Sequence, residues 1–142
     1  MIDLRLYLDK ISDFNYVIIK YDVPYQTKDF PDTYPIGKDL DILTTDFDKL
    51  VKFTKEFTKW TKIIKKENNV RFRLDGLTST NGKNKLHYQI DITHDINYPY
   101  YKIKKDNFYI LPDNKEYEIR KNLKKPHHIE WCKNYSLKLH NK

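Results

Sequence analysis

The spacing of apolar residues along the chain predicts a mixture of short strands and helices. Compact or alternating runs of apolar residues are typical of strands, whereas apolar residues that recur every three to four positions indicate an amphipathic helix. Strands are expected at residues 16–19, 39–43, 70–74, 85–93 and 107–111. Helices are expected at residues 2–12, 46–66, 116–124 and 126–139, although the first of these segments also alternates like a strand. The pattern therefore predicts an α/β protein.

Turn and capping signals agree with this division of the chain. Thr45 and Asp48 resemble a capping box, which predicts that a helix begins there. Asn81 and Gly82 form a hairpin turn signal between the third and fourth expected strands. Residues 22–35 contain three prolines and no sustained periodicity, so they are expected to form a long loop. Loops of this length within a compact domain are often functional.

The candidate chemistry begins with two acids in the strand at residues 39–43. Successive side chains of a strand point to opposite faces, so Asp39 and Asp41 share one face while Leu40 and Ile42 share the other. Two neighbouring carboxylates repel each other, and a divalent cation commonly neutralises such a pair. The pair is therefore a candidate metal site, with solubility at a sheet edge as the structural alternative.

Asp91 strengthens this interpretation. It lies between two isoleucines on the polar face of another expected strand, which could neighbour the strand of Asp39 and Asp41. Three carboxylates on one face would hold one or two Mg²⁺ or Mn²⁺ ions, which clamp a triphosphate and neutralise the leaving pyrophosphate. In that scheme Asp39 and Asp41 bind the ions, and Asp91 completes the catalytic metal site and helps to deprotonate the acceptor hydroxyl.

These residues resemble a known family, the nucleotidyltransferase-fold superfamily, which includes poly(A) polymerases, CCA-adding enzymes, aminoglycoside nucleotidyltransferases and small minimal nucleotidyltransferases. The resemblance covers about residues 16–93 and lies in Asp39-Leu40-Asp41-Ile42-Leu43, the helix that follows, and Ile90-Asp91-Ile92. It implies a short mixed β-sheet flanked by helices, binding of an NTP and Mg²⁺, and transfer of a nucleoside monophosphate to a hydroxyl. Residues 1–142 are then expected to form a single domain, with a C-terminal helical extension at about 115–140.

The residues that would bind phosphate depart from the family pattern. Members usually carry a Gly-Ser or Gly-Gly pair about ten residues before the aspartate pair, and this chain has none. Either Gly37, Lys38 and the long loop replace that cradle, or triphosphate binding is weakened or lost. Arg71 and Arg73 alternate with core residues and are further candidates for phosphate contacts, with a solvated strand face as the alternative.

Composition narrows the function classes without choosing one. The formal charge of +7 favours anionic partners such as nucleotides or RNA, although lysine supplies most of it. No apolar run approaches the roughly 20 residues that a membrane span requires, and the single cysteine, Cys132, fits a reducing compartment, so a cytoplasmic protein is expected. The sequence names no acceptor, which could be an RNA end, a protein side chain, a sugar phosphate or a small molecule.

The sequence therefore supports two functions from different classes. The first is a metal-dependent nucleotidyltransferase that uses Asp39, Asp41 and Asp91. The second is a catalytically inactive module that binds a nucleotide or nucleic acid on the same fold, and its motive is the absent glycine pair together with the basic charge. A glycosyltransferase also uses an aspartate pair, but such domains are generally larger than this chain.

Overall fold

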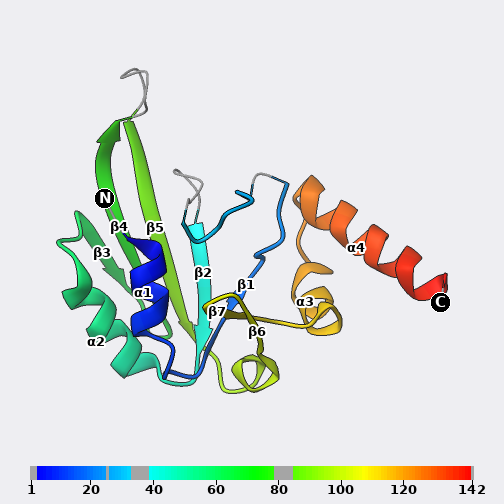
Figure 1. The fold of residues 1–142 in the computed structure, drawn as a ribbon, viewed down its shortest axis with the longest axis horizontal. Coiled ribbons are helices and arrows are strands. Elements are labelled where there is room, and N and C mark those ends of the chain that lie inside the picture. Colours follow the sequence, from blue (N-terminus) through cyan, green and yellow to red (C-terminus); the bar gives the residue numbers. More distant parts are fainter. Residues whose placement is uncertain (1–2, 25, 33–38, 79–84, 142) are drawn as a thin grey trace.

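The computed structural model describes residues 3–24, 26–32, 39–78 and 85–141 (Figure 1). The helices among them are α1 (Leu4–Lys10), α2 (Phe47–Phe57), the 3₁₀ turn η1 (Tyr98–Tyr101), α3 (Asp113–Arg120) and α4 (Pro126–His140). The strands are β1 (Tyr16–Ile19), β2 (Asp39–Thr44), β3 (Lys62–Lys65), β4 (Asn69–Thr78), β5 (Lys85–His94), β6 (Ile103–Lys105) and β7 (Phe108–Ile110). No helix in these ranges is both long and apolar enough to cross a lipid bilayer.

The strands form one mixed sheet of seven strands in the order β3-β4-β5-β2-β1-β7-β6. β2 runs parallel to β5, and β1 runs parallel to β7, while the remaining neighbours are antiparallel. β5 and β2, which carry the acids singled out above, are therefore internal strands and lie side by side. The predicted fold class, a mixed sheet flanked by helices, is confirmed.

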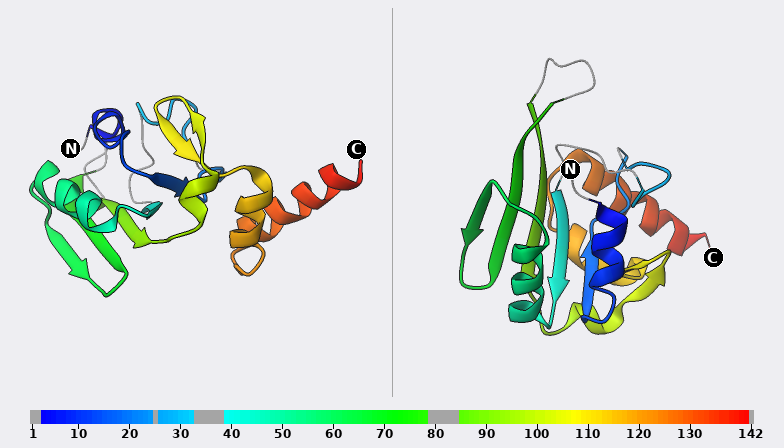
Figure 2. Two further views of the ribbon diagram at one scale, coloured as in Figure 1. Left: turned by 90° about the horizontal axis from the view of Figure 1, so that it is seen from below. Right: turned by 60° about the vertical axis from the view of Figure 1, so that its left-hand side comes forward.

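One face of the sheet packs against α1 and α2, which lie together on that side (Figures 1 and 2). Alternate strand residues point into this main core, as the period of two requires. The strand residues of the core include Ile18, Leu40, Ile42, Val70, Phe72, Ile90 and Ile92, and the helical ones include Leu4, Tyr7, Leu8 and Leu50. Full burial of one such aliphatic or aromatic side chain contributes about 1.5–3 kcal/mol. This core therefore fixes which side of β2 and β5 faces away from the helices.

A smaller core lies on the opposite face, near β1 and the outer end of β2. Val17, Leu43 and Leu111 are buried there, and Tyr98 of η1 and Ile119 of α3 pack against them. α4 packs mainly on α3 and projects away from the sheet (Figures 1 and 2). The acids of β2 and β5 share this second face, beside the part that α3 covers.

The helix expected at residues 46–66 is wrong in its second half. α2 ends at Phe57, and the backbone of Thr58 is already extended, with φ −152° and ψ 171°. The chain then forms β3, which pairs with β4, while the indole N–H of Trp60 donates to the carbonyl of Thr54 at 2.7 Å. The isoleucines in β3 fit the spacing of a helix as well as that of a strand. Pairing with β4 therefore decides that this segment is a strand.

The expected capping box is also wrong, because Asp46 and not Thr45 is the N-cap residue of α2. The Asp46 carboxylate makes no hydrogen bond to the helix, and it accepts one from the backbone N–H of Asn15 at 2.7 Å. Thr45 accepts from the Asn15 side-chain amide at 2.9 Å. Both side chains therefore join the turn before β1 to the start of α2.

The other predicted elements are confirmed with small changes at their ends. β7 lies within the segment expected at residues 107–111, and it pairs with β6, which had not been expected. α3 begins at Asp113 and ends at Arg120, and Pro126 occupies the first turn of α4. β4 and β5 pair antiparallel as the hairpin signal predicts, although Asn81 and Gly82 themselves lie outside the described residues.

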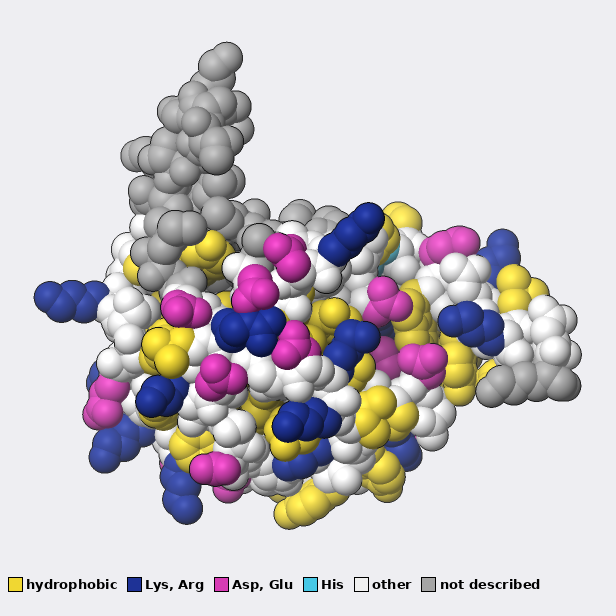
Figure 3. Space-filling model, in the orientation of Figure 1, with side chains coloured by type: hydrophobic (Ala, Val, Ile, Leu, Met, Phe, Trp, Pro, Cys, Tyr) yellow, Lys and Arg dark blue, Asp and Glu magenta, His cyan; other side chains and the backbone are white. Residues whose placement is uncertain are grey.

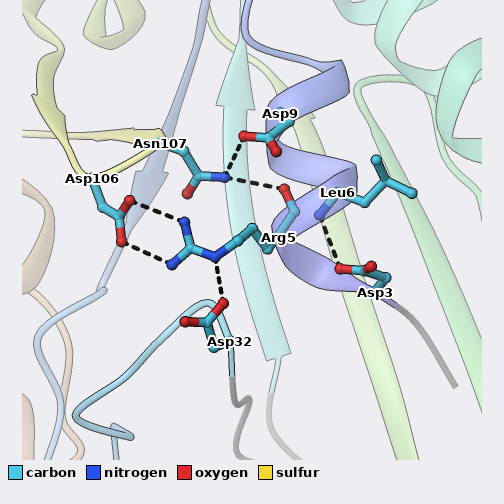
Figure 4. Close-up of polar contacts among 7 residues, drawn as sticks. All are labelled: Asp3, Arg5, Leu6, Asp9, Asp32, Asp106 and Asn107. Atoms are coloured by element: carbon cyan, nitrogen blue, oxygen red, sulfur yellow. Dashed lines mark hydrogen bonds and ion pairs between the residues drawn. The ribbon is translucent and has the colours of Figure 1, made fainter.

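Surface charges tie distant segments together around α1 (Figure 4). The guanidinium of Arg5 donates to both oxygens of Asp106 at 3.1 and 3.0 Å, and it also pairs with Asp32. Asn107 donates from its side-chain amide to Asp9 at 2.7 Å. The face that carries α1 shows acidic and basic side chains interspersed, with no broad field of one sign (Figure 3). The positive net charge is therefore not concentrated on this face.

Candidate active site

A row of charged side chains crosses the sheet on the face opposite α1 and α2. In the strand register, Arg71 of β4 lies beside Asp91 of β5, and Asp91 lies beside Asp41 of β2. Ile19 of β1 continues the same row on the other side of Asp41. Residues paired in this way have neighbouring side chains on one face of the sheet. Two carboxylates are consequently held next to each other by backbone pairing alone.

The adjacent row contains the third acid. Asp39 lies beside Gln89 of β5, and Gln89 lies beside Arg73 of β4. The Gln89 amide donates to Oδ2 of Asp91 at 3.2 Å, which links the two rows. Asp39 therefore shares the face of Asp41 and Asp91, one row away, and its side chain is exposed.

Asp91 is the most buried of the three acids and is neutralised by Arg71. Its residue exposure is 8%, and its Oδ1 accepts from Nε of Arg71 at 2.9 Å. This hydrogen bond and the Asp91 charge raise the pKa of Arg71 above its ordinary value. The arginine predicted as a phosphate contact is thus an ion-pair partner of the central acid in this conformation.

Asp41 has a different cation, which the sequence did not indicate. Nζ of Lys20 lies 3.0 Å from Oδ2 of Asp41. Burial nevertheless raises the pKa of the Asp41 carboxyl, and the charges of Asp91 and Asp39 add to that effect while Lys20 opposes it. The charged form of Asp41 is therefore destabilised, because the ion pair with Lys20 does not fully offset burial and the charges of the neighbouring acids.

Lys20 is positioned by a buried ion pair in α3. Its backbone is left-handed, with φ 56°, and its N–H donates to Oε1 of Glu116 at 2.7 Å. The same oxygen accepts from Nε of Arg120 at 2.9 Å, and Glu116 and Arg120 are only 6% and 1% exposed. The sequence shows Glu116 and Arg120 at the i,i+4 spacing of a helical ion pair. It contains no local pattern that distinguishes Lys20 from the other lysines.

The remaining predicted site residues fall into two groups. Arg73 lies on the expected face, but its Nε pairs with Oδ1 of Asp75 at 2.7 Å and not with the three acids. Gly37 and Lys38, which were predicted to bind phosphate, lie outside the described residues.

The donor atoms suit a hard divalent cation in kind, because Mg²⁺ and Mn²⁺ prefer carboxylate oxygens. Three carboxylates share one sheet face, and the pKa of Asp41 is raised mainly by burial, with a smaller contribution from the charges of Asp91 and Asp39. Across the described ranges, however, no three histidine, cysteine or acidic side chains are gathered closely enough to hold a metal ion. Asp41 and Asp91 are turned toward Lys20 and Arg71, so an ion would have to compete with these side chains.

The seven-stranded mixed sheet with its flanking helices is a nucleotidyltransferase-like fold. Two solved structures carry a similar arrangement: JHP933 from Helicobacter pylori, with a TM-score of 0.55 and 12% identity, and a protein from Helicobacter pylori named as a "putative nucleotidyltransferase", with a TM-score of 0.55 and 11% identity. Each similarity covers 82% of this chain but only 52% and 54% of those chains, so this chain spans about half of their length. At such low identity the likeness concerns the fold.

Comparison at the level of sequence adds no relative. No protein-family model matches the chain, and no curated protein sequence matches it.

Proposed function

We propose that the protein is a metal-dependent nucleotidyltransferase that moves a nucleoside monophosphate from an NTP to a hydroxyl acceptor. The observation that carries this proposal is the side-by-side register of Asp41 and Asp91 on parallel strands, with Asp39 on the same face. One of the two solved structures with a similar fold is named as a "putative nucleotidyltransferase", and this supports the proposal. The lone cysteine, Cys132, is free, which fits a cytoplasmic enzyme.

In this proposal each acid has a separate task. Asp39 and Asp41 would hold Mg²⁺ or Mn²⁺ together with the triphosphate, and Asp91 would complete the site and help to deprotonate the attacking hydroxyl. The bound cation would neutralise the charge that develops on the departing pyrophosphate. Arg71 leaves Asp91 and contacts a phosphate oxygen, for which its fork of N–H donors is suited.

The central test is nucleotide binding by variants of the two acids that lie side by side. Asp41→Asn and Asp91→Asn should each weaken Mn²⁺-dependent binding of an NTP by at least about tenfold, since each removes a ligand charge without changing shape. Binding is measured by calorimetry with each of the four NTPs, and transfer by mass analysis of the protein and of added RNA. Asp48→Asn is the matched control, because Asp48 is exposed in the first turn of α2, on the opposite side of the sheet. Unchanged binding by Asp41→Asn contradicts the proposal.

A second function, a catalytically inactive nucleotide- or nucleic-acid-binding module, is favoured by the ion pairs themselves. Lys20 and Arg71 already pair with Asp41 and Asp91, so each of these two acids has a counter-ion without a metal. Such a module would bind RNA or a nucleotide equally well with EDTA present, without turnover, and with an affinity that falls as salt rises. Metal-dependent transfer in the wild-type protein excludes it.

A further inference from the structure

A groove runs along one side of α4, between this helix and the segment that follows β1 (Figure 1). It has two adjoining parts, of about 390 and 240 Å³, which share Asp22, Trp131 and Asn134 as lining residues. The lining residues of α4 recur at helical spacing, so they lie along one side of the helix over about 16 Å. They are His127, Glu130, Trp131, Asn134, Tyr135 and Lys138.

Two aromatic rings form a wall of this groove. The rings of Trp131 and Tyr135 are nearly parallel, with an angle of 11° between them and 5.6 Å between their centres. Tyr117 of α3 supports Tyr135, with 5.3 Å between the ring centres. Both Trp131 and Tyr135 are half-buried, so each ring packs on the protein and still borders the groove.

Trp131 is held from behind by the buried Arg120. The guanidinium carbon lies 4.6 Å from the centre of a Trp131 ring, which is the distance of a cation–π contact. Nε of Arg120 donates to Glu116 at 2.9 Å, and its two terminal nitrogens have no hydrogen-bond partner among the described residues. The indole is therefore the second partner of this charge. A ring fixed in this way loses little conformational entropy when a ligand stacks on it.

Hydrogen-bonding groups lie beside the aromatic wall. Asn134 belongs to the same side of α4, and Asp22 borders both parts of the groove from the segment after β1. The amide of Asn134 both donates and accepts hydrogen bonds, whereas the carboxylate of Asp22 only accepts them. A flat aromatic surface with such groups near it suits a flat heterocycle that carries N–H groups. Nucleobases are heterocycles of this kind, and they stack on aromatic side chains.

The charges of the groove suit a ligand whose base and phosphate are separate. Three acids line it, Asp22, Asp113 and Glu130, so a free phosphate ion is repelled from much of it. Cations lie toward the two ends of α4: Lys138 lines the groove near one end, and Lys125 is exposed at the N-cap of the other. A nucleic-acid strand can place a base between the acids and its phosphates near these lysines.

We propose that this groove binds a single-stranded nucleic acid, with one unpaired base stacked on Trp131 and Tyr135. The lysines near the two ends of α4 contact the flanking phosphates. A duplex does not fit, because its bases are paired and stacked inside the double helix. The inference goes beyond the proposed function, since it requires neither a metal ion nor an NTP and uses none of the three acids on β2 and β5.

Tryptophan fluorescence tests this proposal, because a base that stacks on an indole ring quenches its emission. The chain has two tryptophans, and Trp60 packs on Phe72 in the main core, on the other face of the sheet. Trp60→Phe therefore leaves Trp131 as the reporter. In EDTA, single-stranded oligoadenylate should quench this emission, and the same strand annealed to oligouridylate should not.

Variants of the full chain locate the contact, with the affinity for end-labelled oligoadenylate measured by fluorescence anisotropy in EDTA. Trp131→Leu and Tyr135→Leu should each weaken binding by about tenfold, because stacking on one ring is lost. Tyr100→Leu is the control, since Tyr100 is an exposed aromatic residue of η1 outside the groove. Lys138→Met should make the affinity less dependent on salt, as loss of one phosphate contact requires. Thermal melting confirms that each variant is folded.

The outcomes distinguish this inference from the proposed function. Quenching by the single strand alone, with weaker binding in both aromatic variants of α4 and unchanged binding in Tyr100→Leu, supports the groove as the site. Equal quenching by single strand and duplex, or wild-type affinity in folded Trp131→Leu, overturns base stacking. An unchanged salt dependence in Lys138→Met overturns the phosphate contact. Because EDTA is present throughout, these results do not depend on whether Asp41→Asn changes metal-dependent binding of an NTP.

Discussion

Glu116 and Lys20 are joined by a hydrogen bond of 2.7 Å between a buried helix carboxylate and the backbone at the end of β1. The contact bridges 96 positions of the chain and connects α3 to the edge of the candidate site. Because Arg120 pairs with the same carboxylate oxygen, the orientation of Lys20 depends on an ion pair that does not itself touch the three acids.

Removing one partner of the buried ion pair between Glu116 and Arg120 in α3 should strongly destabilise the fold. Arg120→Met leaves Glu116 without its cation in a buried position, and it is expected to lower the free energy of unfolding by about 3–5 kcal/mol. The double variant Glu116→Gln, Arg120→Met should recover part of this loss, since neither charge then remains. Urea unfolding measures both quantities.

The control for this prediction lies on the same helix. Lys115 and Glu118 form an ion pair of 3.3 Å that is partly exposed, so Lys115→Met should cost at most about 1 kcal/mol. A similar cost for Arg120→Met and Lys115→Met would show that burial of the Glu116 pair contributes nothing.

Neutralising Asp41 should stabilise the fold at neutral pH even though it is expected to weaken metal binding. Burial and the neighbouring acids raise the pKa of Asp41, so the unfolded chain releases this proton more readily than the folded protein does. Stability is therefore lost as pH rises from the ordinary aspartate range through the raised value. Asp41→Asn should melt higher than wild type at pH 7, with a gain that shrinks toward pH 4.

The same melting curves contain the check on this prediction. Asp75→Asn removes an acid that is 37% exposed and paired with Arg73, so its melting temperature should follow that of the wild type or fall slightly at both pH values. A lower melting temperature for Asp41→Asn at pH 7 would mean that the ion pair with Lys20 outweighs the cost of burial.

His128 in α4 should make the fold sensitive to acid. The side chain is 4% exposed, and its Nδ1 has no hydrogen-bond partner in the described part of the chain. Burial lowers the pKa of His128 to about 4, and the neighbouring charges of His127, Arg120, Lys20 and Lys125 act in the same direction. The stability contributed by the neutral ring is thus complete above about pH 6.5 and is lost between about pH 6.5 and 4.

Thermal and urea unfolding between pH 7 and pH 4 test this behaviour. Within that window the free energy of unfolding of the wild type should fall by up to about 1.4 kcal/mol per pH unit because of His128. His128→Leu should remove this dependence on pH. His140, which is exposed near the end of α4, provides the control variant His140→Leu, expected to keep the slope of the wild type. Parallel curves for His128→Leu and wild type would contradict the prediction.

Most strands and helices were predictable because their periodicity is local. β1 and β2 lie where apolar runs and alternation indicated, and the proline in the first turn of α4 marked its start. The error at β3 has the same origin, because Ile63 and Ile64 also fit the helical spacing of the preceding segment. Only the hydrogen bonds of β4 hold these residues as a strand.

The sequence by itself determined the fold class and the face of each strand, because side-chain direction follows from the chain's own repeat. It could place Asp39 and Asp41 on one face, but not decide which strand lies next to them. The tertiary structure decided that Asp91 stands beside Asp41 and that Lys20 reaches the same carboxylate. These contacts join segments distant in sequence through strand pairing and a buried ion pair, and no local pattern encodes such partners.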